Sequence, residues 1–262
     1  MIQTLKRLYL RLKYWKYGWF GNYPSWSAAQ AECTGYNAGN ILAKVRAAIL
    51  KVKNGEAAWE RDSVLSDKIE YSWPVLANIL WIAQQNQNSL KILDFGGSLG
   101  STFFQNRLYL KNLNSLTWDV VEQNEFVTTG QKEIAGHGLN FHYTIDEAVN
   151  ASGLHNVFLI SSALPYIEKP YDLINEITDK NFPYIIVDLT YFNPKPGDRI
   201  TIQKVPPFYY DASYPAWFLD YDKVAAAFGN KYEMIAEFTN AEFLYLYGEK
   251  IDYRGFIMKL KN

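Results

Sequence analysis

One stretch, residues 91–101, constrains the fold of this chain more than any other. It reads KILDFGGSLGS, a short apolar run followed by three glycines within five residues. The apolar run is typical of a strand buried on both faces. The glycines permit a tight turn and let a ligand approach the backbone closely, and residues 102–108 continue as the start of a helix. The stretch therefore predicts either a site for a nucleotide-like ligand or an ordinary strand-to-helix turn.

After residue 90, short apolar runs alternate with helical patterns, which favours an α/β fold with a parallel sheet covered by helices. Further helices are predicted over 126–135, 171–180 and 224–228. Residues 232–238 and 253–260 are predicted to end the chain as an antiparallel pair. The expected parallel strands are 91–95, 116–122, 140–143, 156–161 and 184–189.

Composition and charge exclude several classes of protein. The 262 residues are 48% hydrophobic, enough for a sizeable core, and the net charge of −1 provides no basic field for nucleic acid. Cys33 is the single cysteine, which excludes an intrachain disulfide and a cysteine-built zinc site and fits a reducing, cytoplasmic compartment. No apolar run reaches the roughly 20 residues needed to span a bilayer. The 43 aromatic residues (20 Tyr, 15 Phe, 8 Trp) suit sugar stacking as well as an aromatic core.

Glu122 is the predicted ribose-binding residue. It ends the second predicted strand, where its carboxylate could accept hydrogen bonds from two ribose hydroxyls. A surface glutamate at a strand end is the alternative interpretation. The dinucleotide fingerprint G-x-G-x-x-G would need a glycine where Phe95 stands, and no Walker lysine is present. The turn therefore does not provide a cradle for a pyrophosphate.

The pattern Asp94-x-Gly96-x-Ser98-x-Gly100 instead resembles motif I of class I S-adenosylmethionine-dependent methyltransferases, in which glycine is usual at the position of Ser98. The resemblance implies a Rossmann-like seven-stranded sheet and S-adenosylmethionine as the cofactor. It also implies that the acid before the glycines orients the site, while the turn passes the methionine part of the cofactor. The cofactor-binding residues implied in this way are Asp94, Gly96, Gly97, Ser98, Gly100, Ser101, Glu122, Gln123, Asp146, Ser161 and Ser162.

Short motifs are spread along nearly the whole chain: SWS (25–27), GY (35–36), ERD (60–62), ILDFGGSLGS (92–101), FQN (104–106), VEQ (121–123), SSALPYI (161–167), IVDLT (186–190), VPP (205–207) and DASYPAW (211–217). In this order they are similar to a family of methyltransferases encoded among bacterial O-antigen, lipopolysaccharide and capsule genes. The resemblance implies methylation of a sugar hydroxyl in a surface polysaccharide or its lipid-linked precursor. Leu189 departs from the pattern, because arginine is usual there.

The chain is predicted to have two parts. Residues 1–89 are expected to form a helical extension that caps the cofactor or substrate, and residues 90–262 the methyltransferase domain. An insert at 190–218, on the acceptor side, follows the fifth strand. Within it, residues 198–205 alternate with period two, which is typical of a strand exposed on one face. The insert is interpreted as a lid over the site or as a surface excursion packed by its own aromatics.

Asp188 is the first candidate for a general base, because it ends the fifth strand on the edge where the cofactor would lie. A sugar hydroxyl is a poor nucleophile, so removal of its proton matters. The alternative is that Asp188 only caps a turn. Arg199 is the second catalytic candidate, as a group that orients the acceptor. The substrate-binding candidates are Tyr36, Arg61, Gln203, Tyr210, Asp211 and Tyr214.

The three histidines, His137, His142 and His155, are interpreted as structural or solvated residues. No second histidine or suitably spaced acid accompanies any of them, so no metal centre is predicted.

Residues 1–20 carry five basic and no acidic residues, with apolar positions near helical spacing. This pattern predicts a basic amphipathic helix. Its partner would be an anionic membrane surface at the inner face of the membrane, a glycan-assembly enzyme, or the chain's own domain. Ser25 or Ser27 is predicted to cap a helix over 26–32, with further helices over 41–54 and from residue 73.

Two other functions stay open at this point. An NAD-linked sugar oxidoreductase would use the same strand and turn, although the missing first glycine argues against it. A non-catalytic docking module of a polysaccharide assembly complex would use residues 1–20 and bind no cofactor.

Overall fold

The computed structural model describes residues 16–34, 38–207, 209, 211–246 and 248–262. The basic segment up to residue 15, Tyr36 and Tyr210 lie outside the described residues. The helices are α2 (Trp26–Ala31), α3 (Ala38–Lys53), α4 (Trp73–Gln85), α5 (Ser101–Leu110), α6 (Asn124–Thr129), α7 (Ile145–Ser152), α8 (Pro170–Asp179) and α9 (Tyr221–Gly229). The strands are β1 (Gly18–Tyr23), β2 (Trp59–Arg61), β3 (Val64–Ser66), β4 (Ser89–Phe95), β5 (Ser115–Val121), β6 (Leu139–His142), β7 (Val157–Ser161), β8 (Tyr184–Thr190), β9 (Arg199–Lys204), β10 (Ser213–Phe218), β11 (Tyr232–Leu246) and β12 (Glu249–Leu260).

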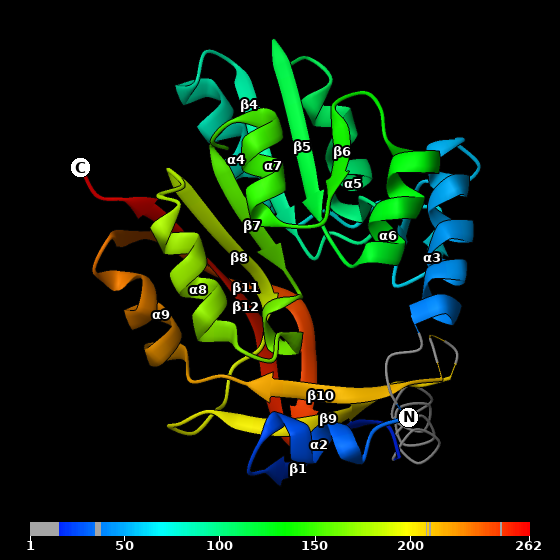
Figure 1. Cartoon of the computed structure of the whole chain (residues 1–262), viewed down its shortest axis with the longest axis vertical. Helices are drawn as coiled ribbons and strands as arrows, with labels where there is room; N and C mark the ends of the chain where they lie inside the picture. Colours follow the sequence, from blue (N-terminus) through cyan, green and yellow to red (C-terminus); the bar gives the residue numbers. More distant parts are fainter. Residues whose placement is uncertain (1–15, 35–37, 208, 210, 247) are drawn as a thin grey trace, which may run out of the picture.

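A seven-stranded sheet forms the centre of the molecule, in the order β6-β5-β4-β7-β8-β12-β11. The first five strands of this order are parallel, and β12 is antiparallel to both of its neighbours. Figure 1 shows the parallel strands pointing toward one edge, where the chain folds back as β9 and β10. This is the class I methyltransferase sheet, so the predicted fold class is confirmed.

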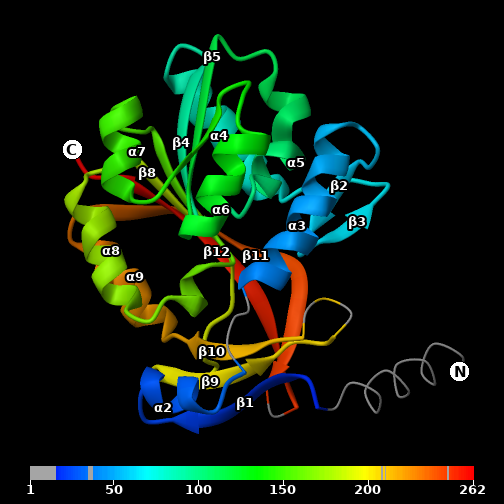
Figure 2. The ribbon, with the colours of Figure 1, turned by 45° about the vertical axis from the view of Figure 1, so that its right-hand side comes forward.

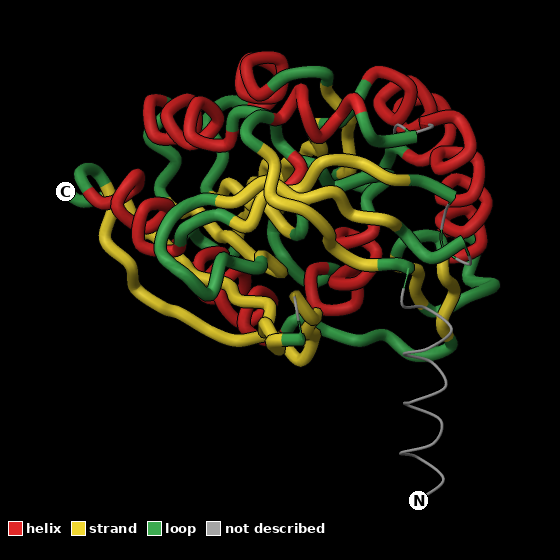
Figure 3. The backbone as a smooth tube through the Cα atoms, turned by 90° about the horizontal axis from the view of Figure 1, so that it is seen from below, coloured by secondary structure: helices red, strands yellow, loops and turns green. Residues whose placement is uncertain are grey.

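Helices cover both faces of the sheet because its strands are apolar on both sides. Leu90 and Ile92 of β4 belong to one hydrophobic cluster with residues of α3, α4 and α5. Leu93, on the opposite face of the same strand, belongs to a second cluster with residues of α7, α8 and α9. Figure 3, seen from below, shows the strands between these two layers of helix. The near-continuous apolar runs of the sequence follow from this double burial.

A small three-stranded sheet, β1-β9-β10, lies beyond the carboxyl edge of the central sheet (Figures 1 and 2). Strand β1 pairs antiparallel with β9, so that Trp19 lies opposite Gln203. The expected helix over residues 1–20 is therefore wrong at its end, where Gly18 starts a strand with φ of +116°. Pairing with a strand some 180 residues away decided this conformation, and local periodicity does not reveal such a partner.

Other boundaries differ from the sequence-based expectation in two places. The hairpin of β11 and β12 is longer than predicted, because it continues past the central sheet toward the small sheet. The N-terminal part is also less helical than predicted, since β2 and β3 form a hairpin before α4. Ser25 caps α2 as predicted, accepting from the backbone N–H of Ala28 at 3.2 Å.

No helix in the described part of the chain is long and apolar enough to cross a membrane.

Candidate functional site

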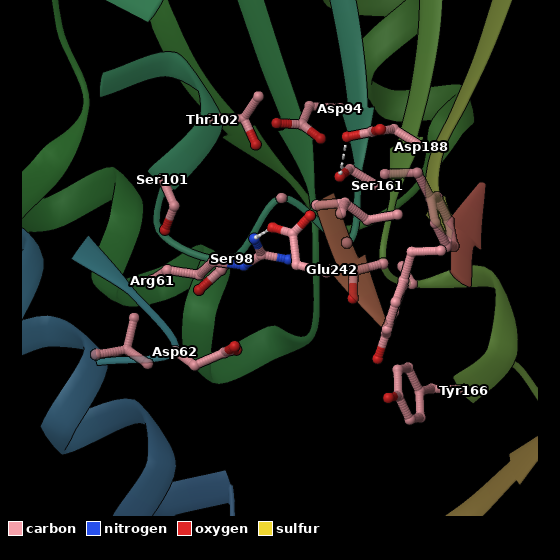
Figure 4. Close-up of a pocket in the computed structure, with 18 of the residues that line it drawn as sticks. Arg61, Asp62, Asp94, Ser98, Ser101, Thr102, Ser161, Tyr166, Asp188 and Glu242 are labelled. Carbon is pink, nitrogen blue, oxygen red and sulfur yellow. Dashed lines mark hydrogen bonds and ion pairs between the residues drawn. The ribbon is translucent and has the colours of Figure 1, made fainter. Parts of the chain in front are cut away.

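A cavity of about 1600 Å³ opens at the carboxyl edge of the parallel strands, between the central sheet and the small sheet. Its walls come from the loops after β4, β5 and β7, the end of β8, the β2–β3 hairpin, the β11–β12 hairpin and β9–β10. Figure 4 shows side chains from several of these segments pointing into one space. The predicted residues that line it are Arg61, Asp94, Gly96, Gly97, Ser98, Ser101, Glu122, Gln123, Ser161, Ser162, Asp188, Gln203 and Tyr214.

The glycine turn after β4 forms one wall of the cavity and leaves no room for side chains. Gly96 has φ of +72°, and a Cβ there would lie 2.6 Å from the Cβ of Ala163. A Cβ at Gly97 would lie 2.6 Å from the carboxyl group of Asp94. Ser98 also takes a left-handed conformation, with φ of +55°, which is why glycine suits this position of the motif.

Asp94 ends its strand inside the protein, with only 1% of its surface exposed. Its carboxylate accepts a hydrogen bond of 3.0 Å from the indole N–H of Trp118. Burial raises the pKa of Asp94 from 3.8 to about 7, despite that hydrogen bond. Glu122 stands at the end of the neighbouring strand and accepts from the backbone N–H of Gln123 at 2.6 Å. Burial raises the pKa of Glu122 as well.

Asp188 reaches the cavity through a bulge in β8. Residues 188 and 189 both face a single residue of β12, and Leu189 has φ of +47°, a rare conformation for a branched side chain. The Asp188 carboxylate is 3% exposed. It accepts hydrogen bonds from Ser161 Oγ and Asn240 Nδ2, both at 3.0 Å. Burial raises the pKa of Asp188, and these two donors oppose the shift.

A second bulge supplies residues that sequence reasoning missed. Three residues of β11, 240–242, face one residue of β12, and both Asn240 and Glu242 line the cavity. Glu242 forms an ion pair with Arg61, in which Arg61 Nη1 lies 2.6 Å from Glu242 Oε1. Figure 4 shows this ion pair in the middle of the cavity. Asp62 lies beside Arg61, in a hairpin turn where φ is +50°. The ERD motif covers residues 60–62 of the hairpin, although no hairpin was predicted there from the sequence, and no motif covers residues 240–242.

Four predicted site residues do not line this cavity. Arg199 lies on β9, where its guanidinium donates to the backbone carbonyl of Gly21 at 2.8 and 3.2 Å. Asp146 is exposed in the first turn of α7 and pairs with Lys180. Asp211 is exposed, and Gly100 caps the start of α5 instead. The sequence placed these residues near the edge but could not give the direction of their side chains.

The surroundings of His155 indicate a structural role for this residue. His155 is fully buried, and its Nε2 lies 2.8 Å from Asp119 Oδ2. Burial opposes ionisation of Asp119, but hydrogen bonds from histidine and from Asn140 outweigh it and lower the pKa of Asp119. Among the described residues, no three His, Cys, Asp or Glu side chains are grouped so that they could hold a metal ion.

No family model matches this sequence, and no curated protein is significantly similar to it. Several solved structures have a similar fold. The N-terminal domain of EvdMO1, solved with S-adenosylhomocysteine and D-fucose, is 14% identical over 86% of this chain and 98% of its own, with a TM-score of 0.49. Magnesium protoporphyrin IX methyltransferase from Synechocystis, with bound S-adenosylmethionine, is 11% identical over 83% of this chain and 97% of its own (TM-score 0.47).

A methyltransferase from Clostridium acetobutylicum is 9% identical over 86% of this chain and all of its own, with a TM-score of 0.46. Similarities this distant carry no information about reaction or substrate, which depend on the residues of the site. The strand order of this chain itself defines the class: a class I methyltransferase fold with a large cavity at the carboxyl edge of its sheet.

Proposed function

We propose that this protein is an S-adenosylmethionine-dependent O-methyltransferase that acts on a sugar hydroxyl of a bacterial surface polysaccharide or its lipid-linked precursor. One observation carries the proposal: the glycine turn after Asp94, the strand-end Glu122 and the buried Asp188 all line the same cavity. The first two suit a nucleoside-containing cofactor, and the third suits proton removal from an acceptor.

The residues at one end of the cavity fit the cofactor. Glu122 ends β5, where a carboxylate can accept from two ribose hydroxyls. Gly96 and Gly97 leave the backbone bare next to Asp94, so that a ligand can lie against it. The cavity of about 1600 Å³ exceeds the roughly 300–1,000 Å³ of a typical small-ligand site, which leaves room for an acceptor beside the cofactor.

Asp188 is proposed as the general base. S-adenosylmethionine supplies, when bound, a methyl group on a good leaving group. Asp188 accepts the proton of the sugar hydroxyl as that oxygen becomes the nucleophile, and burial makes it a stronger base than an exposed carboxylate. Ser161 and Asn240 hold the carboxylate in place through hydrogen bonds to its two oxygens. The protonated Asp188 then releases its proton to water in the cavity.

The far end of the cavity suits a carbohydrate. Tyr166 and Tyr214 line it with their rings perpendicular, and Tyr166 donates to Gln203 Oε1 at 2.7 Å. Aromatic rings beside a polar group are typical of surfaces on which sugars stack. The polysaccharide part of the proposal rests on the series of motifs that resembles the surface-polysaccharide family. It implies a cytoplasmic enzyme, whose residues 1–20 would contact the membrane or another glycan-assembly enzyme.

Titration calorimetry with S-adenosylhomocysteine tests the cofactor. The wild type is expected to bind it, and Glu122→Ala to bind about tenfold or more weakly because the ribose loses a charged acceptor. Gly96→Arg is expected to abolish binding, since even a Cβ lies 2.6 Å from Ala163. Binding that both variants leave unchanged would contradict the proposed site. NAD, titrated under the same conditions, should give no heat, and a tight NAD complex would favour the oxidoreductase instead.

A further inference from the structure

The proposed cofactor ends in an α-amino acid, which carries one carboxylate and one ammonium group. A site that binds it needs a cation and a buried acceptor close to the glycine turn. The β2–β3 hairpin lies against this turn, because Ser101 at the start of α5 donates from Oγ to Glu60 Oε1. Neither Glu60 nor this hairpin is part of motif I.

Arg61 is suited to the carboxylate. Arg61 and Lys204 are the cationic side chains among the described residues that line the cavity. Lys204 belongs to β9, and its ammonium lies over the ring of Phe20 at 5.7 Å, within the small sheet. Arg61 adjoins Glu60, and its Nη1 binds Glu242, while its Nε and Nη2 have no hydrogen-bond partner among the described residues. Two donors of the guanidinium fork are therefore available to a carboxylate.

Glu60 is suited to the ammonium group. Its side chain is 1% exposed, and its donors are the Ser101 hydroxyl and the Ser63 backbone N–H, the latter at 3.1 Å. No Lys, Arg or His side chain in the described part of the chain forms an ion pair with it. A buried carboxylate without a counter-ion is costly, and burial raises the pKa of Glu60 accordingly. A ligand ammonium group would supply the missing positive charge and leave the two existing donors in place.

We propose that the β2–β3 hairpin holds the amino-acid end of the cofactor, with Arg61 binding its carboxylate and Glu60 its ammonium group. The inference rests on the cofactor proposed above. It assigns Arg61 to the cofactor, whereas the sequence pattern suggested the acceptor. It also accounts for the turn at Asp62 and Ser63. Both residues have positive φ, a strained conformation for non-glycine residues, and this turn brings Glu60 and Arg61 to the cavity wall.

Two ligands separate this inference from the proposed function. S-adenosylhomocysteine carries the amino acid, and 5′-methylthioadenosine has the same nucleoside and thioether without it. Calorimetry should show that Arg61→Gln and Glu60→Gln each weaken S-adenosylhomocysteine binding about tenfold or more, because each removes a charge-assisted contact. Both variants should bind 5′-methylthioadenosine within about twofold of the wild type. Melting temperatures of the variants report whether they fold.

Arg46→Gln is the matched control, because it makes the same substitution at an exposed arginine that pairs with Glu133 and does not line the cavity. It should leave S-adenosylhomocysteine binding within about threefold of wild type. The inference is overturned if Arg61→Gln leaves that affinity unchanged, if it weakens both ligands equally, or if Arg46→Gln weakens it as much. A wild-type protein that binds neither ligand would instead remove the proposed function, and this inference with it.

Discussion

At the scale of single residues, the protein keeps carboxylates in places where water cannot stabilise their charge. Asp94, Glu60 and Asp188 are each 3% exposed or less, and burial raises the pKa of all three. None of them forms an ion pair with a lysine, arginine or histidine among the described residues. Buried carboxylates with raised pKa values are typical of sites where a ligand or a reaction uses the group.

Asp94 should make folding stability depend on pH. Its folded pKa is about 7, well above its ordinary value of 3.8. Between these values the unfolded chain loses the proton and the folded protein keeps it, so stability falls as pH rises from about 4 to 7 and then levels. Asp94→Asn cannot ionise. Its free energy of unfolding, relative to wild type, should rise by up to about 1.4 kcal/mol per pH unit across that window.

Urea unfolding of both proteins at several pH values between 4 and 8 measures this difference. Asp67→Asn, an exposed residue, controls for the loss of a surface carboxylate. A difference between Asp94→Asn and wild type that stays constant over the range would mean that Asp94 is already ionised in the folded protein at low pH.

At the scale of elements, the small sheet joins distant parts of the chain and closes the far side of the cavity. Strand β1 precedes the methyltransferase sheet, whereas β9 and β10 belong to the insert after β8. The indole N–H of Trp19 donates to the hydroxyl of Tyr191 at 2.9 Å, and the two rings lie 5.3 Å apart. The N-terminal extension and the insert therefore form one structural unit over the site.

Trp19→Ala should weaken this unit without affecting the cofactor end. Loss of a half-buried indole is expected to lower the free energy of unfolding by about 2–3 kcal/mol. Trp19→Phe keeps a ring and loses the hydrogen bond to Tyr191, at a cost of about 1 kcal/mol. Urea unfolding measures both. An unchanged stability of Trp19→Ala would show that β1 adds little to the fold, and calorimetry should find S-adenosylhomocysteine affinity within about twofold in both variants.

At the scale of the whole molecule, the proposed acceptor site exists only when three segments meet. Asp188 comes from β8, Ser161 from the end of β7, and Asn240 from the bulge in β11. Figure 4 shows Asp188 and Ser161 close together across the cavity from Ser98 and Ser101. Asp188 and the residues that hold it therefore lie on a different side of the cavity from the glycine turn that is proposed to hold the cofactor.

Asp188→Asn should reduce methyl transfer and leave cofactor binding nearly unchanged. Asparagine cannot accept the proton of a hydroxyl, so methyl transfer should fall about 100-fold or more. Incorporation of labelled methyl from S-adenosylmethionine into the lipid-linked glycans of the host cell measures it. S-adenosylhomocysteine affinity should change less than about threefold. Asp172→Asn, exposed on α8, is the control, and undiminished labelling by Asp188→Asn would exclude Asp188 as the base.

The local sequence pattern was sufficient to predict much of the central sheet. The runs before Asp94 and Glu122 were predicted as strands because burial on both faces demands continuous apolar residues, and that signal is local. The bulges at Leu189 and at residues 240–242 were not predicted. A bulge depends on the register between two strands, and a single strand does not encode it.

By itself, the sequence determined the alternation of strands and helices, the glycine turn after Asp94 and the strand-end position of Glu122. These depend on apolar periodicity and on the conformations that glycine permits, which neighbouring residues set. Only the tertiary structure decided that Gly18–Tyr23 is a strand, that Arg199 binds the backbone and that Arg61 meets Glu242. Each of these depends on a partner some 180 residues away, and no local pattern specifies where a side chain finds such a partner.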